Sequence, residues 1–414
     1  MLLKLTSLLG LCAFIGLAWG MSRHRKQFPW RTVGWGLGLQ ILFALLILKT
    51  PFGEGFFMAA QKGVERLNWS ATEGAKMVFG PLGNTAVLSA KLGPDNAFVF
   101  AIAVSATVIV VSALSSLFYH WGVLQRVVHA MAVVMQKAMR TSGSETLATA
   151  ANIFIGQTEA PLIVKPYIPR MTQSELLALM IGGMATIAGG VMAVYVLMGA
   201  SSGHLLTASV MSAPAALMVA KIILPETETS ETASNSPVSY EKTATNSVDA
   251  LCRGASDGMM LSLNILAMLI AFVAVVALAN YLLGVAQRPL GLGNPVTLQQ
   301  FFGWLNAPFA WLMGVPAKDC LFIGQVLGER IVLNEFFGYL SLTQQKAALD
   351  PRSFTLATYA LCGFANFSSI AIQIGGIGAL APDRRADLAR LGIRAMVGGL
   401  LACYITATIV GMLI

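Results

Sequence analysis

Repeated long runs of apolar residues constrain this chain more than any other feature. Of its 414 residues, 56% are hydrophobic and only 11% are charged. A helix that crosses roughly 30 Å of hydrocarbon needs about 20 predominantly apolar residues. Eight runs predict eight transmembrane helices, at residues 5–21, 34–48, 98–119, 176–198, 205–224, 259–283, 354–374 and 393–414. We therefore expect an all-α, polytopic membrane protein.

The basic residues beside the first and last runs predict how the chain is oriented. Only Lys4 precedes the first run, whereas the basic stretch at 23–26 follows it directly. Loops rich in Lys and Arg stay in the cytoplasm, so the N-terminus is expected outside. A cleavable signal peptide would carry its charge before the apolar core instead. Eight spans return the C-terminus to the outer side, and the basic stretch at 383–394 then falls inside.

The remaining composition argues against several other classes of protein. The net charge of +8 sits in short loops beside spans, where topology and anionic lipid account for it, so nucleic-acid binding is not expected. The five cysteines and four histidines are scattered without the spacing of a disulfide framework or a zinc site. The chain has no HExxH motif and no cluster of metal-ligating residues, which disfavours an intramembrane enzyme. No organic cofactor is expected.

Three segments between the spans have characters of their own. Residues 52–77 repeat apolar side chains at helical spacing, which predicts an amphipathic helix on the membrane surface, with an ordinary loop helix as the alternative. Residues 225–249 are rich in Thr, Ser and Glu and nearly devoid of large apolar residues, which predicts a solvated, mobile linker between two halves. The apolar piece at 301–315 is ambiguous.

Two further segments, 144–169 and 318–342, combine apolar character with embedded polar clusters. The first contains GQTEAP and precedes the small-residue tract GGMATIAGG at 182–190, which lies within a span. The second contains NEFFGY and precedes GFANFSSIA at 363–371, again within a span. Interrupted helices at matching places in two internal repeats point to a substrate site near the membrane midplane.

Each polar segment is too short to span the membrane and too polar to face lipid, so its non-helical backbone must be buried in protein or line a wet cavity. We therefore expect two re-entrant hairpins. An intramembrane carboxylate costs roughly 2.5 to 3.5 kcal/mol or more, which favours functional roles for Glu159 and Glu335. The alternative is that each carboxylate forms an ion pair with a basic residue such as Lys165 or Arg330.

The segments GQTEAPLIVKPY, NEFFGY and CGFANFSSIAI resemble the signature segments of the concentrative nucleoside transporter family, in particular its shorter bacterial members. The resemblance covers nearly the whole chain. It departs from the family pattern at Arg330, where Lys is more frequent, and at Gly338, where Ala is usual. It implies a homotrimer in the bacterial cytoplasmic (inner) membrane, each protomer having a scaffold region and a transport region.

The domain organisation expected from the repeats and the resemblance has five parts. Residues 1–135 form scaffold spans with the interfacial helix, and 136–224 form the first transport repeat of re-entrant hairpin, broken helix and span. Residues 225–250 form the solvated linker, 251–315 a scaffold and trimerisation region, and 316–414 the second transport repeat.

The resemblance also implies a substrate site. The nucleobase would meet Gly156, Gln157, Thr158, Glu159 and Val191, and the ribose would meet Glu335, Asn366 and Ser369, with Phe364 closing one side. This chemistry is reasonable, because carboxylate and amide oxygens accept from ribose hydroxyls and a glutamine amide pairs with a pyrimidine edge. The alternatives are core packing for Phe364 and helix–helix hydrogen bonding for Asn366 and Ser369.

The expected function is a secondary active symporter that imports nucleosides, uridine-like and leaning to pyrimidines, by alternating access. The coupling ion is expected to be sodium, because unwound helix ends supply oxygen ligands without a further full charge. By resemblance the sodium shell would be Asn152, Ile155, Thr186 and Ile187. Proton coupling through Glu159 is the alternative within this class. A passive channel and an intramembrane enzyme are more remote alternatives.

Overall fold

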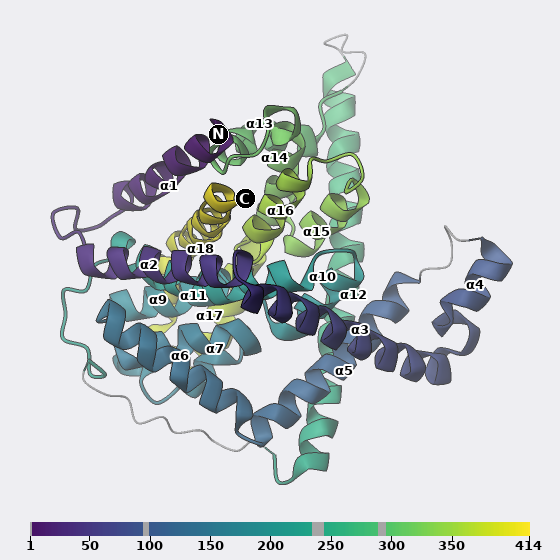
Figure 1. Ribbon diagram of the computed structural model, residues 1–414, viewed down its shortest axis with the longest axis horizontal. Helices are drawn as coiled ribbons and strands as arrows, with labels where there is room; N and C mark the ends of the chain where they lie inside the picture. The colour runs from purple at the N-terminus through teal and green to yellow at the C-terminus, as the bar shows by residue number, and fades with distance from the viewer. Residues whose placement is uncertain (1, 94–98, 234–243, 289–294) are drawn as a thin grey trace.

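The computed structural model describes residues 2–93, 99–233, 244–288 and 295–414, and within these ranges the chain consists of helices and their connections (Figure 1). The predictions for residue 98, at the start of the third span, and for residues 234–243 of the linker lie outside the described residues. The helices form a peripheral set and two repeats. Each repeat consists of a hairpin, an interrupted helix and a continuous helix.

The peripheral set comprises the N-terminal helices and two helices between the repeats: α1 (Leu2–Gly20), α2 (Trp30–Leu48), α3 (Pro51–Phe79), α4 (Thr85–Leu92), α5 (Phe100–His120), α6 (Val123–Met139), α12 (Ser247–Gln287) and α13 (Leu298–Leu312). A short 3-10 turn, η1 (Gly80–Gly83), joins α3 to α4. The predicted surface helix is α3, which begins with Pro51 in its first turn after the capping residue Thr50.

The first repeat comprises α7 (Gly143–Ile155), α8 (Ala160–Ile163), η3 (Ile168–Arg170), α9 (Gln173–Met184), α10 (Gly189–Leu197) and α11 (Ser202–Ile223). The second comprises α14 (Ala317–Val332), α15 (Glu335–Gln344), α16 (Pro351–Leu361), α17 (Phe367–Leu380), η5 (Pro382–Arg384) and α18 (Arg385–Leu413). The hairpins are α7–α8 and α14–α15, and the interrupted helices are α9–α10 and α16–α17. Both predicted hairpins and both predicted helix breaks are therefore present.

The long helices match the predicted spans. Among the described residues, seven helical segments are long and apolar enough to cross a membrane: α1, α2, α5, α9 with α10, α11, α12 and α18. The eighth predicted span, 354–374, is divided between α16 and α17, and α17 is a shorter apolar helix. The eight-span, all-α prediction is confirmed, with the last of the two broken spans made of two short helices.

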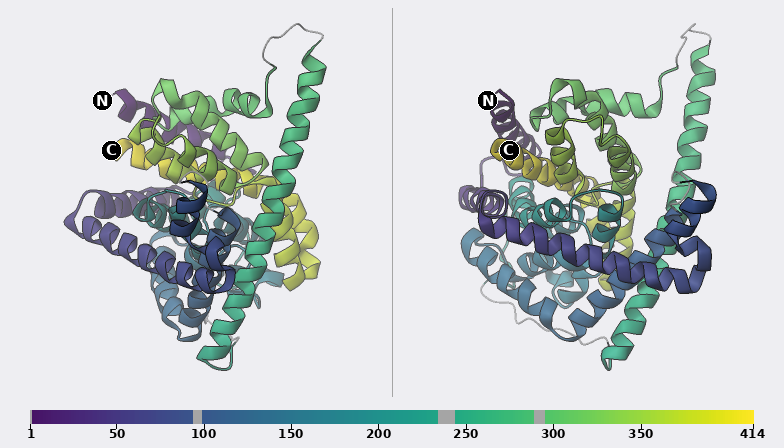
Figure 2. Two further views of the ribbon diagram at one scale, coloured as in Figure 1. Left: turned by 90° about the vertical axis from the view of Figure 1, so that its right-hand side faces the viewer. Right: turned by 45° about the vertical axis from the view of Figure 1, so that its right-hand side comes forward.

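Burial separates the core of the molecule from its periphery. Most residues of α11 and α18 are buried, and every residue of α9 after Gln173 is buried. Long α12 instead exposes nearly all its side chains and runs along one side of the molecule, where it packs on α5 (Figure 2). Gly254 and Gly258 permit this approach, since a Cβ on Gly258 would lie 2.7 Å from the Ile109 Cα.

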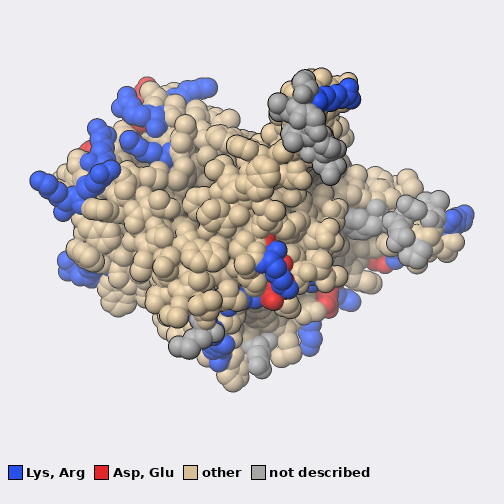
Figure 3. Space-filling view, turned by 90° about the horizontal axis from the view of Figure 1, so that it is seen from above, with Lys and Arg blue, Asp and Glu red and all other residues tan. Residues whose placement is uncertain are grey.

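Charged side chains avoid most of the surface. Figure 3 shows one face on which Lys and Arg gather mainly along the edges, with broad uncharged areas between them. Exposed apolar residues cover the peripheral helices, among them Ile270 at 74% and Leu278 at 58% exposure on α12. An exposed apolar surface of this extent is expected where lipid or another membrane protein covers it.

Two features differ from the sequence-based expectations. Helix α6 is an additional amphipathic helix whose buried residues, among them Val128, Ala132 and Met135, follow helical spacing and pack on α7. The predicted solvated linker is mostly exposed at its start, but Thr232 is buried, and its carbonyl accepts from the Gly143 N–H at 2.9 Å. The first part of this segment is therefore bound to the root of the first hairpin.

Candidate functional site between the two repeats

The candidate site lies where the two interrupted helices approach each other. The unwound stretch of α9–α10 contains Thr186, and that of α16–α17 contains Phe364. The Phe364 N–H donates to the Thr186 carbonyl at 3.3 Å. Gly363 makes the approach possible, because a Cβ there would lie 2.8 Å from the Met184 carbonyl oxygen. The two stretches are thus in direct backbone contact although the sequence separates them widely.

Glu335 occupies the tip of the second hairpin, at the first position of α15. Its carboxylate is buried and accepts two hydrogen bonds, from the Tyr195 hydroxyl at 2.9 Å and from the Asn366 Nδ2 at 3.1 Å. These donors come from α10 of the first repeat and from the start of α17. The N-terminus of α15 favours a negative charge at the same place.

The alternative in which Glu335 or Glu159 pairs with a basic residue is not observed. Arg330 is fully buried, but it donates to the Ala360 carbonyl and, at 3.3 Å, to the Cys403 Sγ. Among the described residues, the ion pairs involve other groups, and neither Glu159 nor Glu335 belongs to one. Glu335 is therefore a buried carboxylate that, among the described residues, accepts its side-chain hydrogen bonds from neutral donors.

Asn366 has two functions in the local structure. Its Oδ1 caps α17 by accepting from the Ser369 N–H at 2.8 Å, while its Nδ2 donates to Glu335. The side chain of Ser369 in turn accepts from the Gln157 Nε2 at 3.1 Å. A continuous polar chain therefore connects the two hairpin tips through the first turn of α17.

The tip of the first hairpin is built differently. Gly156 ends α7 with a φ of +84°, a conformation that favours glycine, and a Cβ at this residue would lie 2.9 Å from the Ala188 Cβ. Gln157 is buried, whereas Thr158 and Glu159 are exposed. Within the described residues, Glu159 makes none of the side-chain hydrogen bonds that hold Glu335.

Two remaining residues of the predicted site border this region. Val191 lies in the first turn of α10 and is buried, and Phe364 is half-buried in the second unwound stretch. The predicted set therefore occupies both hairpin tips, the first turns of α10 and α17, and the unwound stretch before α17.

The four residues of the predicted sodium shell belong to the first repeat. Asn152 and Ile155 are in the last part of α7, and Thr186 and Ile187 are in the unwound stretch after α9. Asn152 is completely buried; its Nδ2 donates to the Ala148 carbonyl at 3.1 Å, while its Oδ1 has no hydrogen-bond partner among the described residues. A buried acceptor oxygen without a donor fits a cation ligand, since such an oxygen is costly unless something pairs with it.

Thr186 and its neighbours add further oxygens of the kind that sodium prefers. The Thr186 hydroxyl donates to the Gly182 carbonyl at 3.0 Å, which leaves its oxygen lone pairs free to face away. Among the described residues there is no cluster of His, Cys, Asp and Glu that could hold a metal ion. The donor set of amide, hydroxyl and carbonyl oxygens suits a monovalent cation rather than a transition metal.

Two buried polar residues of the site were not predicted from the sequence. Tyr195 donates to Glu335 and stacks on Tyr339 with ring centroids 4.2 Å apart. Gln373, one turn after Ser369 on α17, donates to the Gln157 Oε1 at 3.1 Å. Their sequence signal is a polar side chain within an apolar helix that directly follows a break, a position where such residues are costly and usually functional.

A buried ion cluster lies at the root of the first hairpin. Lys221, near the end of α11, approaches the Glu145 Oε2 at 2.8 Å and the Glu226 Oε2 at 3.3 Å, and it donates to the Ser174 Oγ at 2.9 Å. Glu145 also accepts from the Ser142 N–H in the capping box that begins α7. This cluster connects α7, α9, α11 and the start of the linker.

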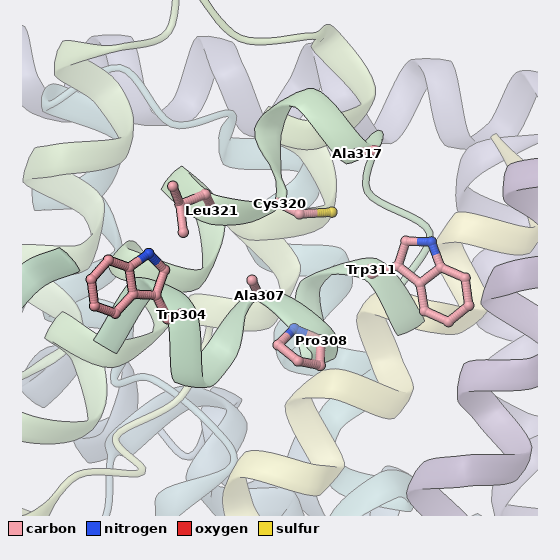
Figure 4. Close-up of a pocket in the computed structure, with 7 residues that line it drawn as sticks. All are labelled: Trp304, Ala307, Pro308, Trp311, Ala317, Cys320 and Leu321. Carbon is pink, nitrogen blue, oxygen red and sulfur yellow. The ribbon is translucent and has the colours of Figure 1, made fainter. Parts of the chain in front are cut away.

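An apolar cavity of about 400 Å³ lies apart from the candidate site, between α13 and α14. Figure 4 shows its lining, which includes Trp304, Trp311 and Cys320. Trp304 and Trp311 are both exposed. The cavity contains none of the predicted site residues and opens onto the apolar outer surface.

This arrangement, with two hairpins and two interrupted helices meeting inside a polytopic bundle, defines a secondary transporter, and comparisons with known proteins agree. Residues 204–411 match the family model described as "Na+ dependent nucleoside transporter C-terminus", and residues 9–82 match the N-terminal model. Residues 101–202 match a model described as "Nucleoside recognition".

Individual relatives extend over almost the full length. An uncharacterized transporter of Haemophilus influenzae is 43% identical, covering 99% of this chain and 98% of the relative. The nucleoside permease NupC of Helicobacter pylori is 37% identical over 99% of this chain and 98% of its own. A solved structure of CNTnw in an inward-facing, substrate-bound state is 38% identical, with a TM-score of 0.92 and coverage of 99% and 97%.

The chain therefore belongs to the concentrative, sodium-dependent nucleoside transporter family. The resemblance found in the sequence is confirmed. The family consists of transporters rather than enzymes, so the intramembrane-enzyme alternative is set aside, and sodium is the coupling ion of the family.

Proposed function

We propose that this chain is a sodium-coupled symporter that imports nucleosides, uridine-like ones first, by alternating access. The observation that carries the proposal is the hydrogen-bonded chain from Glu335 through Asn366 and Ser369 to Gln157. It places acceptors and donors from both hairpin tips beside two unwound helices, as a polar ligand within a membrane requires.

The ribose part of the substrate is assigned to Glu335, Asn366 and Ser369, with Phe364 beside it. Glu335 is a buried carboxylate held by neutral donors, so it keeps its remaining lone pairs for ribose hydroxyls. Hydrogen bonds to a carboxylate are roughly twice as strong as neutral ones, which makes this residue the main ribose acceptor in the proposal.

The nucleobase is assigned to the first hairpin tip and its neighbours: Gly156, Gln157, Thr158, Glu159 and Val191. Gly156 has no side chain beside the base, and the Gln157 amide offers one donor and one acceptor to a pyrimidine edge. The Gln157 amide, which suits a pyrimidine edge, supports a preference for pyrimidine nucleosides with some purine tolerance.

Sodium is assigned to Asn152, Ile155, Thr186 and Ile187. The buried, unpartnered Asn152 Oδ1 supports this assignment because a cation would satisfy it. Proton coupling through Glu159 is the second candidate, because this carboxylate belongs to no ion pair among the described residues. Sodium is preferred as the coupling ion because the proposed ligands are neutral oxygens, which can bind a cation without a change of protonation.

Assembly and location complete the proposal. The long apolar face of α12, beside α5, is proposed as part of a homotrimer interface, with the remaining apolar surface covered by lipid. The protein is placed in a bacterial inner membrane with both termini outside, because the basic stretches at 23–26 and 383–394 belong to the cytoplasmic side. The five-part domain division given above is retained, apart from the ordered start of the linker.

Competition against uridine uptake tests the substrate assignment. Purified protein in proteoliposomes should accumulate labelled uridine, and unlabelled uridine should compete. Free uracil and 2′,3′-dideoxyuridine should compete poorly, because a site built to bond hydroxyls leaves its own polar groups unpaired when they are missing. If free uracil competes as well as uridine, the ribose assignment is wrong.

A further inference from the structure

Gln373 holds the amide of Gln157 in one orientation. It is almost completely buried on α17, and its Nε2 donates to two oxygens, the Gln157 Oε1 and the Met180 carbonyl, each at 3.1 Å. The Gln157 Nε2 donates to the Ser369 Oγ, also at 3.1 Å. Four groups from two helices, α9 and α17, and from a hairpin tip therefore form one directed chain of hydrogen bonds.

The backbone carbonyl of Met180 sets the direction of this chain. A carbonyl oxygen only accepts, so Gln373 must turn its NH2 group toward Met180 and cannot present its own oxygen there. The same NH2 group also donates to Gln157, so the Gln157 amide must turn its carbonyl oxygen toward Gln373 to accept this bond. The Gln157 NH2 group is left on the side of Ser369, and a rotation of this amide by 180° would break its bond to Gln373, whereas the Ser369 hydroxyl can donate as well as accept.

Close packing keeps Gln373 from leaving this position. A Cβ on Gly183 of α9 would lie 2.5 Å from the Gln373 Nε2 and 2.9 Å from the Gln157 Cβ. Both glutamines therefore lie directly against the backbone of α9, in space that only a glycine leaves open. Gln373 itself was not among the predicted substrate contacts; its NH2 group is occupied by Met180 and Gln157, while its Oε1 has no hydrogen-bond partner among the described residues.

The orientation of the Gln157 amide matters because uracil and cytosine present opposite patterns. At positions 4 and 3 uracil offers an acceptor and then a donor, whereas cytosine offers a donor and then an acceptor. An amide that pairs with one of these edges must rotate by 180° to pair with the other. If the ribose is fixed, the base edge stays in one place, and the amide orientation decides which base is matched.

We propose that Gln373 is a positioning residue that fixes the Gln157 amide and thereby sets the selectivity between uridine-like and cytidine-like bases. This inference rests on the proposed nucleoside transport function and on the contact of Gln157 with the base. Gln373 acts through Gln157 and does not touch the substrate.

The test compares uridine and cytidine as competitors of labelled uridine uptake into proteoliposomes. Gln373→Met keeps the length of the side chain and removes its hydrogen bonds, which frees the Gln157 amide to rotate. The ratio of the two half-inhibition concentrations should move toward one by about fivefold or more, as expected for regaining roughly one buried hydrogen bond to the disfavoured base. Ile372→Met, an exposed change on the same helix, should leave the ratio unchanged.

A purely structural role for Gln373 predicts a different result. It would lower uptake while both nucleosides competed in the wild-type ratio, and that outcome would overturn the inference. If Gln373→Met does not give folded protein by size-exclusion chromatography, Gln373→Asn carries the same test, since its shorter amide cannot reach both oxygens. If the wild-type protein transports neither nucleoside, the proposed function fails instead, so the two failures are distinguishable.

Discussion

The two re-entrant hairpins have the same chain order, but they hold their carboxylates in opposite ways. The first hairpin buries an ion cluster of Lys221 and Glu145 at its root and leaves Glu159 exposed at its tip. The second has a buried carboxylate at its tip, where Glu335 is bonded by Tyr195 and Asn366. At its root, within the described part of the chain, Asp319 is bonded by neutral donors, the Asp350 N–H and the Ser353 hydroxyl.

A repeated motif therefore does not determine which of the two hairpin tips holds its carboxylate rigidly. The donors that hold Glu335 come from α10 and from the start of α17, so the partner repeat decides how firmly the tip is fixed. A carboxylate with fixed donors is a prepared acceptor for a ligand, whereas one without them retains freedom to turn or to take up a proton.

The ion cluster at the first root should dominate stability. Lys221→Met leaves Glu145 buried without its cation, and breaking a buried pair on one side costs about 3–5 kcal/mol. The midpoint of thermal unfolding in detergent should fall clearly, while Lys165→Met, an exposed change in the same hairpin, should have little effect. The double variant Glu145→Gln/Lys221→Met should be more stable than Lys221→Met. A loss below about 1 kcal/mol for Lys221→Met would show that the cluster does not anchor the hairpin.

The two tip carboxylates should respond unequally to neutralisation. Glu335→Gln removes the charged acceptor and should lower uridine uptake by about 10- to 100-fold, the equivalent of roughly 1.5–3 kcal/mol for a hydrogen bond to a charged group. Glu159→Gln should have a smaller effect, because its exposed carboxylate has no bonded partner to lose. Initial uptake rates at low uridine concentration measure both. Equal losses would remove the proposed distinction between the two hairpins.

The sequence predicted the overall architecture and the order of elements that is repeated in the two halves of the chain. Apolar runs gave the spans, and the polar clusters at 144–169 and 318–342 gave the hairpins, because both signals are local along the chain. Helix α6 was missed because its periodic apolar residues, such as Val128 and Met135, are fewer than a span requires. The ordered start of the linker was missed because burial of Thr232 depends on Gly143, far away in the sequence.

Residues of the candidate site could be predicted when they belonged to a sequence motif. They could not be predicted when only a contact with another element of the fold identifies them. Glu159 and Glu335 were visible as carboxylates within apolar segments, and the resemblance supplied their neighbours. Tyr195 and Gln373 were not predicted, because their importance comes from Glu335 and Gln157 on other elements. Such pairings depend on the close approach of α10 and α17 to the hairpin tips, which no local pattern in the sequence specifies.

The smallest predicted effect concerns the support of Glu335. Tyr195→Phe removes one of its two donors and keeps the aromatic packing on Tyr339, so uridine uptake should fall by about three- to tenfold, equivalent to roughly 0.5–1.5 kcal/mol. Tyr359→Phe is the matched control, since Tyr359 is also buried but its hydroxyl contacts His204 instead. If both variants behave alike, Tyr195 does not position the carboxylate.

Uridine uptake into proteoliposomes under separate ion gradients tests the central claim most directly. We expect concentrative uptake under an inward sodium gradient at equal pH, and none under a pH gradient in potassium or choline. Asn152→Ala and Thr186→Ala should each raise the sodium concentration needed for half-maximal uptake, because they remove proposed oxygen ligands. Uptake driven by the pH gradient alone, with no response to sodium, would contradict the account.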